Sequence, residues 1–264
     1  MKTSSLKTKI KSTFIGSTVA LSLIGSTATD TNAQGVKNVV LVHGAFADGS
    51  GYRALYTTLT KKGYNVTIVQ NPLTSLEDDV AATNVVLDKQ NGPVILAGHS
   101  WGGAVITQAG NHPKVAALVY IAAFQPGNGE TALQWLQTIP PAPENGVLPP
   151  DENGIVYYDK AKYHAGFCAD LSKEEADFMF ASQGAFYAKG FATPISKAAW
   201  MDKPTYGLVA TEDKSIAPEI QRAMYLRSNT KVTEVKGSHV IFMSQPDAVG
   251  NVIIEAASKS AVVK

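Results

Sequence analysis

Short β-branched runs alternate with helical patterns along most of this chain. From residue 37 onward, the runs NVVLVH, YNVTIVQ, PVILAG and VAALVYIAAF are separated by segments with helical spacing and helix start or stop signals. Strands that alternate with helices in this way form a parallel sheet covered on both faces. The sequence therefore predicts an α/β fold with a mostly parallel sheet and helices on both faces.

The alternation stops at about residue 125 and resumes near residue 200. The intervening stretch is rich in proline, glycine and aromatic residues, and IPPAPENGVLPPDENG has turn signals throughout. The segment SKEEADFMFASQGAFYAKG predicts one or two helices, with Ser172 as the N-cap. Strand and helix patterns return at PTYGLVA, APEIQRAMYLRSN, TKVTEVKG and QPDAVGNVIIEAASK. We expect residues 125–200 to be an insertion over the sheet.

The N-terminal residues have the three parts of a secretory signal peptide. MKTSSLKTKIK is basic, FIGSTVALSLIGST is apolar but too short for a stable membrane span, and small residues follow. We expect cleavage after Ala33, with Ala28 as the second choice. The predicted organisation is a signal peptide over residues 1–33 and one domain over residues 34–264. The mature protein would be exported, either to the periplasm or out of the cell.

Charge and cysteine content exclude several classes of protein. The formal net charge is +1, and no basic stripe typical of a nucleic-acid-binding protein is present. The single cysteine, Cys168, can form no disulfide within its own chain, and its neighbours GFCAD include no histidine to activate it. We expect Cys168 to be a buried structural thiol. The sequence predicts no metal, no organic cofactor, no nucleic-acid partner and no membrane partner after the signal peptide is removed.

One serine is framed by glycines at the end of a predicted strand. GHSWG, residues 98–102, has the pattern G-x-S-x-G, which is a weak signal by itself. Here it follows PVILAG and opens the helical segment WGGAVITQAGNH, which is the context of a nucleophile elbow. Such a turn exposes the Ser100 hydroxyl and directs the free N–H groups of the next helix toward it. The alternative is a glycine-rich turn that only allows tight strand–helix packing.

A serine nucleophile needs a base, and the base needs an orienting group. Among five histidines we choose His239, because it follows the last predicted strand at the edge where such folds place their sites. Two adjacent carboxylates, Glu212 and Asp213, follow the preceding strand in LVATEDKSI, and we choose Asp213. The chain order is then Ser100, Asp213 and His239, which is the order in one class of serine hydrolases.

Two backbone N–H groups are expected to stabilise the negative charge that develops on the substrate oxygen. One belongs to Trp101, the residue after the serine, and the other to Ala45 in the loop HGAF after the first strand. We expect Phe46, Trp101 and Phe124 to supply apolar contacts to the substrate, together with aromatic residues of the insertion.

Four blocks of the sequence resemble the α/β-hydrolase superfamily: LVHGAF, GHSWGG, ATEDKSI and GSHVIFMSQPDAV. They are similar to an esterase branch that includes bacterial carboxylesterases such as pyrethroid hydrolases, plant methyl-salicylate esterases and hydroxynitrile lyases. The similarity covers about residues 36–258. It implies that Asp213 is the acid and that residues 125–200 form a helical cap over the site.

The same resemblance allows a choice between two reactions of this branch, ester hydrolysis and cyanohydrin cleavage. Hydroxynitrile lyases of this branch carry threonine after the loop histidine and lysine directly after the catalytic histidine. This chain has Gly44 and Val240 at those positions, so no ammonium group is placed to meet a cyanide leaving group. Hydrolysis is therefore favoured.

These features predict a serine hydrolase that cleaves a small, largely apolar carboxylic ester through an acyl-enzyme intermediate. One alternative is a ligand-binding protein that keeps the hydrolase fold but has little turnover. Another is hydrolysis of a lactone, amide or thioester on the same triad. The acyl and alcohol groups of the substrate and the oligomeric state stay open.

Overall fold

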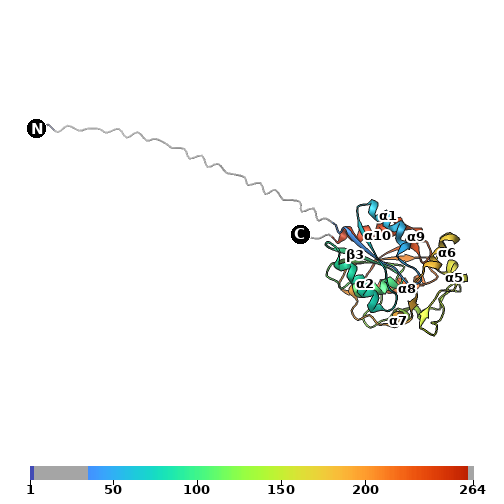
Figure 1. Ribbon diagram of the computed structural model, residues 1–264. Coiled ribbons are helices and arrows are strands. Elements are labelled where there is room, and N and C mark those ends of the chain that lie inside the picture. Colours follow the sequence, from blue (N-terminus) through green and yellow to red (C-terminus); the bar gives the residue numbers. More distant parts are fainter. Residues whose placement is uncertain (3–34, 261–264) are drawn as a thin grey trace. The chain divides into compact units, whose positions relative to one another are not determined.

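A computed structural model describes residues 1–2 and 35–260 (Figure 1). The predicted signal peptide therefore lies almost entirely outside the described residues. All described helices and strands belong to one compact unit. Within the described residues, no helix is long and apolar enough to cross a membrane.

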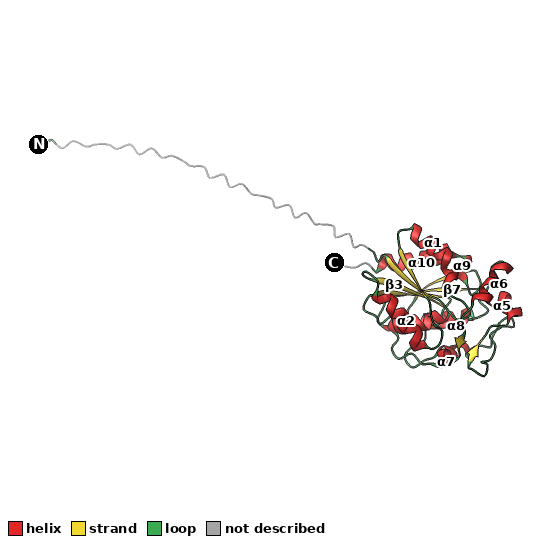
Figure 2. Ribbon diagram, in the orientation of Figure 1, coloured by secondary structure: helices red, strands yellow, loops and turns green. Residues whose placement is uncertain are grey.

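A sheet forms the centre of this unit (Figure 2). It has six strands in the order β2-β1-β3-β4-β7-β8. All neighbouring pairs in this sheet are parallel, which confirms the predicted α/β architecture. The strands are β1 (Asn38–Val42), β2 (Asn65–Val69), β3 (Val94–His99), β4 (Val115–Ile121), β7 (Thr205–Ala210) and β8 (Lys231–Val235).

Helices cover both faces of the sheet (Figure 2). On one face α1 packs against α10, and on the other face lie α2, α3 and α8. The N-cap of α2 is Ser75, whose hydroxyl accepts a hydrogen bond from the Asp78 N–H at 3.1 Å. These helices are α1 (Arg53–Lys61), α2 (Leu76–Asp88), α3 (Trp101–Ala109), α8 (Pro218–Arg227) and α10 (Pro246–Lys259).

The burial of each strand follows its place in the sheet. Every residue of β1 and β3 is buried, because both strands lie inside the sheet with helices on both sides. The edge strands β2 and β8 are mostly exposed or half-buried. The continuous apolar runs therefore identify the strands that carry the core.

The predicted cap lies between β4 and β7. Its helix α6 begins after the predicted N-cap Ser172, which forms a capping box with Glu175. The sequence did not reveal the two-residue antiparallel ribbon of β5 and β6, because strands this short have no periodic pattern. The cap elements are α4 (Ala132–Leu136), β5 (Ile155–Val156), α5 (Lys160–Phe167), α6 (Lys173–Ser182), β6 (Phe186–Tyr187), α7 (Lys189–Ala192) and the 3₁₀ helix η2 (Ala199–Met201).

Arg227, the last residue of α8, contacts both ends of the cap. The Arg227 guanidinium donates to the two Glu130 oxygens at 2.6 and 2.7 Å and to the Gln125 carbonyl at 2.8 Å. Its central carbon lies 4.6 Å from the Trp135 ring centroid and 5.4 Å from that of Trp200. Gln125 and Glu130 lie where the cap begins, and Trp200 lies where it ends. These contacts therefore hold the segment that enters the cap and the segment that leaves it against α8.

Glu130 should make the stability of the protein depend on pH. Burial alone would raise its pKa, but hydrogen bonds from Arg227, the Gly127 N–H and the Trp135 indole outweigh burial and hold the pKa at about 2. Because this value lies below the unfolded value, the stabilisation is present above about pH 4.5 and is lost as the pH falls toward 2. Glu130→Gln should therefore lower the free energy of unfolding by about 1 kcal/mol at neutral pH and by much less at low pH.

Urea unfolding of the wild type and Glu130→Gln, at neutral pH and near pH 3, measures this difference. An equal loss at both pH values would contradict the ionic origin of the stabilisation.

Candidate active site

The residues predicted for the site follow the carboxyl ends of five strands. Six of the seven predicted residues line one cavity of about 230 Å³ at this edge of the sheet. The six are Ala45 and Phe46 after β1, Ser100 after β3, Phe124 after β4, Asp213 after β7 and His239 after β8.

Ser100 occupies a strained turn between β3 and α3, with φ 54° and ψ −120°. A residue with a side chain rarely adopts this backbone, and it costs about 1–3 kcal/mol. Glycines around the serine let α3 approach the sheet closely. A Cβ would lie 2.4 Å from the Gly102 oxygen if added at Gly98, 2.4 Å from the Val42 oxygen at Gly102, and 2.2 Å from the Phe124 oxygen at Gly103.

Gly102→Ala should lower the free energy of unfolding by about 1–3 kcal/mol, because its methyl group would meet the backbone oxygen of Val42. Gly127→Ala is the matched control, since the nearest atom to its Cβ lies at 3.5 Å. Chemical denaturation compares the two variants. Equal stability of both would show that the close approach of α3 to β1 does not require glycine at position 102.

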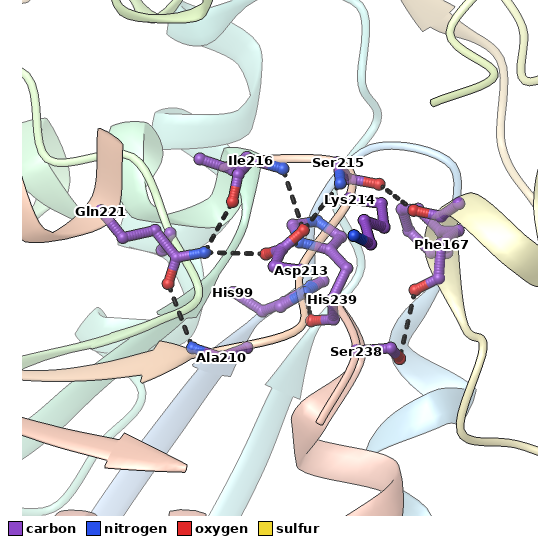
Figure 3. Close-up of polar contacts among 12 residues, drawn as sticks. His99, Phe167, Ala210, Asp213, Lys214, Ser215, Ile216, Gln221, Ser238 and His239 are labelled. Atoms are coloured by element: carbon purple, nitrogen blue, oxygen red, sulfur yellow. Dashed lines mark hydrogen bonds and ion pairs between the residues drawn. The ribbon is translucent and has the colours of Figure 1, made fainter. Parts of the chain in front are cut away.

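His239 and Asp213 form a buried pair (Figure 3). His239 Nδ1 lies 2.6 Å from Asp213 Oδ2, and the side chains are 1% and 0% exposed. The Asp213 carboxylate also accepts from the N–H groups of Ser215 and Ile216, at 2.7 and 2.9 Å, and from Gln221 Nε2 at 2.8 Å. Since a carboxylate only accepts, Nδ1 carries the imidazole proton and Nε2 is left as an acceptor.

The neighbouring carboxylate, Glu212, lies outside this arrangement. Its side chain is 53% exposed, and one oxygen lies 3.5 Å from Lys236 Nζ. Of the two adjacent acids, only Asp213 contacts the imidazole of His239.

Two further side chains hold the loop that carries His239, and no sequence pattern indicated either role. His99 Nε2 donates to the His239 carbonyl at 2.9 Å, and the two rings lie 4.6 Å apart. Burial, together with the nearby His239 ring, lowers the pKa of His99 well below its usual value, so His99 stays neutral. From the cap, the Asp170 carboxylate accepts from the Ser238 N–H at 2.9 Å and from the Ser244 hydroxyl at 2.6 Å.

The other histidines do not reach the cavity lining, where His239 is the one histidine among the described residues. His43 holds the loop after β1: its Nδ1 lies 2.9 Å from the Gly44 carbonyl, and its Nε2 accepts from the Asn71 N–H. His112 contacts Asp88, and His164 contacts the Leu171 carbonyl.

The predicted oxyanion donors lie on the two loops that meet at Ser100. Within the described part of the chain, the backbone N–H groups of Ala45 and Trp101 donate to no protein acceptor. Phe46, beside Ala45, has φ 59°, and its carbonyl accepts from the Tyr163 hydroxyl at 2.7 Å. The cap therefore fixes the conformation of the loop after β1.

The side chain of Trp101 does not line the cavity, so its predicted contact with substrate was wrong. The indole Nε1 instead donates to the buried Asp79 carboxylate at 2.7 Å. Its ring packs edge-on against Phe186 and Phe191, because the first residue of α3 points between α2 and the cap. The role of the Trp101 backbone N–H as an oxyanion donor stays a prediction.

The cavity walls are mostly apolar. Phe46 and Phe124, both predicted to contact substrate, line it, and Phe167 and Phe191 add two aromatic side chains from the cap. A cap segment between residues 136 and 147 also lines the cavity. Its apolar lining residues are Leu136, Ile139, Pro140, Pro141, Ala142 and Val147.

Cys168 is buried, as predicted, and burial raises the pKa of its thiol to about 12. It therefore stays protonated near neutral pH and is a poor nucleophile. In the part of the chain that the structure describes, no group of three or more His, Cys, Asp or Glu side chains could hold a metal ion.

Comparison with known proteins assigns the fold to a family. The alpha/beta hydrolase family matches residues 39–252, and the chain belongs to this family, as predicted. A carbendazim hydrolyzing esterase of Nocardioides sp. (strain SG-4G) is 34% identical over 119 residues, which cover 39% of this chain and 49% of that protein. The pyrethroid hydrolase of Sphingobium wenxiniae is 27% identical over 262 residues, which cover 86% of this chain and 89% of that protein.

A solved pyrethroid hydrolase structure has the same fold. It superposes with a TM-score of 0.72 at 23% sequence identity, and the match covers 83% of this chain and 96% of that chain.

Proposed function

We propose that this protein is a serine esterase that hydrolyses small, largely apolar carboxylic esters. The observation that carries the proposal is the buried His239–Asp213 pair, which lines the same cavity as a serine held in a strained elbow. Two relatives named as an esterase and a pyrethroid hydrolase support the reaction class.

In the proposed mechanism, Ser100 Oγ attacks the ester carbonyl carbon while His239 Nε2 takes the hydroxyl proton. Asp213 keeps the imidazole in the required tautomer and stabilises its charged form. His239 then protonates the departing alkoxide as the bond from carbon to the alcohol oxygen breaks. Water repeats the sequence on the acyl-enzyme, which releases the acid and restores Ser100.

The transition state carries negative charge on the former carbonyl oxygen. The backbone N–H groups of Ala45 and Trp101 would stabilise this charge, and both are free to donate in the described structure. The apolar walls of the cavity favour an uncharged substrate, and its volume of about 230 Å³ favours a short acyl group. Export to the periplasm or beyond, with a small-molecule ester as partner, stays a prediction from the N-terminal pattern.

Ser100→Ala should lower kcat on the order of 10³–10⁶-fold without unfolding the protein, because it removes the nucleophile. Hydrolysis of p-nitrophenyl esters from acetyl to dodecanoyl, by residues 34–264, measures the effect and the chain-length preference. Near-normal turnover by the variant would contradict the mechanism. Tight ligand binding with no serine-dependent turnover would indicate a binding protein instead.

Asp213→Asn should lower kcat on the order of 10³–10⁴-fold, because an amide in place of the carboxylate favours the wrong imidazole tautomer. Glu212→Gln is the adjacent control and should leave kcat almost unchanged, since Glu212 is exposed and lies away from His239. Initial rates with one short ester compare the two variants. Equal losses would leave the assignment of Asp213 unsupported.

A further inference from the structure

One buried carboxylate in α2 takes no direct part in the proposed reaction. Asp79 is completely buried, and burial raises its pKa to about 6 although two hydrogen bonds favour its ionised form. Burial of an acid costs free energy, and an apolar side chain of similar size would avoid that cost. The contacts of Asp79 therefore require an explanation beyond stability.

Asp79 makes one hydrogen bond with each carboxylate oxygen. Oδ2 accepts from the Trp101 indole Nε1 at 2.7 Å, and Oδ1 accepts from the Leu73 N–H at 2.7 Å. Trp101 is the residue directly after Ser100. The first of these bonds therefore connects α2 to the residue that follows the proposed nucleophile.

The Trp101 indole is held on several sides. Its ring centroid lies 5.4 Å from that of Phe186 and 5.7 Å from that of Phe191, both edge-on. A Cβ added at Gly190 would lie 3.3 Å from the indole, so the cap backbone also approaches it closely. The hydrogen bond to Asp79 adds a polar contact that fixes the direction of the indole N–H within this space.

The second bond leads from Asp79 into the cap. Leu73 has φ 60°, and its carbonyl accepts from the Tyr187 N–H of β6 at 3.0 Å. The neighbouring β6 residue, Phe186, packs against the Trp101 ring. A continuous set of contacts therefore runs from the cap through Leu73 and Asp79 to the turn at Ser100.

We propose that Asp79 is a positioning residue: by holding the Trp101 indole and the Leu73 N–H together, it aligns the Trp101 backbone N–H with the oxyanion and keeps β6 against the elbow. This inference rests on the proposed function, since the alignment matters only if Ser100 forms a tetrahedral intermediate. Asp79 itself touches neither the substrate cavity nor the base.

If the Trp101 N–H is misaligned, the transition state should be less well stabilised, while substrate binding should change little. Trp101→Phe removes the indole N–H but keeps an aromatic ring, and Asp79→Asn replaces one acceptor oxygen by a donor. We expect each variant to lower kcat by about 10-fold or more, with KM changed by less than about twofold. The double variant should be no slower than the slower single variant, because both changes break the same hydrogen bond.

The test is a double-mutant cycle on the full mature chain with one short p-nitrophenyl ester, with thermal unfolding recorded for each variant. Asp78→Asn is the control, since Asp78 is on the same helix but its carboxylate accepts its side-chain hydrogen bonds from Thr74 and Ser75. It should keep wild-type kcat. Trp101→Phe carries the test alone if Asp79→Asn does not fold.

An unchanged kcat in Trp101→Phe, with or without a lower melting temperature, would overturn the inference and leave a purely structural contact. Additive losses in the double variant, or a rise in KM without loss of kcat, would also overturn it. Absence of Ser100-dependent turnover in the wild type would instead remove the proposed function, and this inference with it.

Discussion

The strained backbone of Ser100 is the constraint on which the rest of the site depends. The turn at φ 54° is stable only because α3 packs directly on the ends of β1 and β4, where the backbone leaves no room for a Cβ at positions 102 and 103. The loop after β1 is equally close, since a Cβ at Gly44 would lie 2.7 Å from the Ser100 Cβ. The tight packing thus brings the loop after β1, which carries Ala45, close to the turn that carries Ser100 and Trp101.

The loop that carries His239 is held by three parts of the molecule. The elbow contributes His99, the cap contributes Asp170, and the loop after β7 contributes Asp213. A histidine held in this way would need little reorganisation in the proposed role of base, which favours electrostatic catalysis. The cap therefore does more than cover the cavity, because it also contacts the loops that carry Ser100 and His239.

Much of this arrangement could be predicted from the sequence, because it depends on local patterns. The apolar runs identified the strands of the central sheet, and the position of Ser100, Asp213 and His239 after strand ends followed from the shared polarity of parallel strands. The direction of the Trp101 side chain could not be predicted, since it depends on Asp79 and Phe186, which are distant in sequence. The contact by which His99 holds the His239 loop could not be predicted for the same reason, because its partner, the His239 carbonyl, is distant in sequence.

Ser100 is the nucleophile in the proposed mechanism, and covalent labelling tests this role most directly. A fluorophosphonate reacts with an activated serine as the serine oxygen bonds to phosphorus, fluoride departs and the base takes the proton. Mass spectrometry of the intact protein and of its peptides should show a single adduct on the peptide that contains Ser100, and Ser100→Ala should remain unlabelled. Labelling at another residue, or ester hydrolysis that persists with Ser100 fully labelled, would contradict the account.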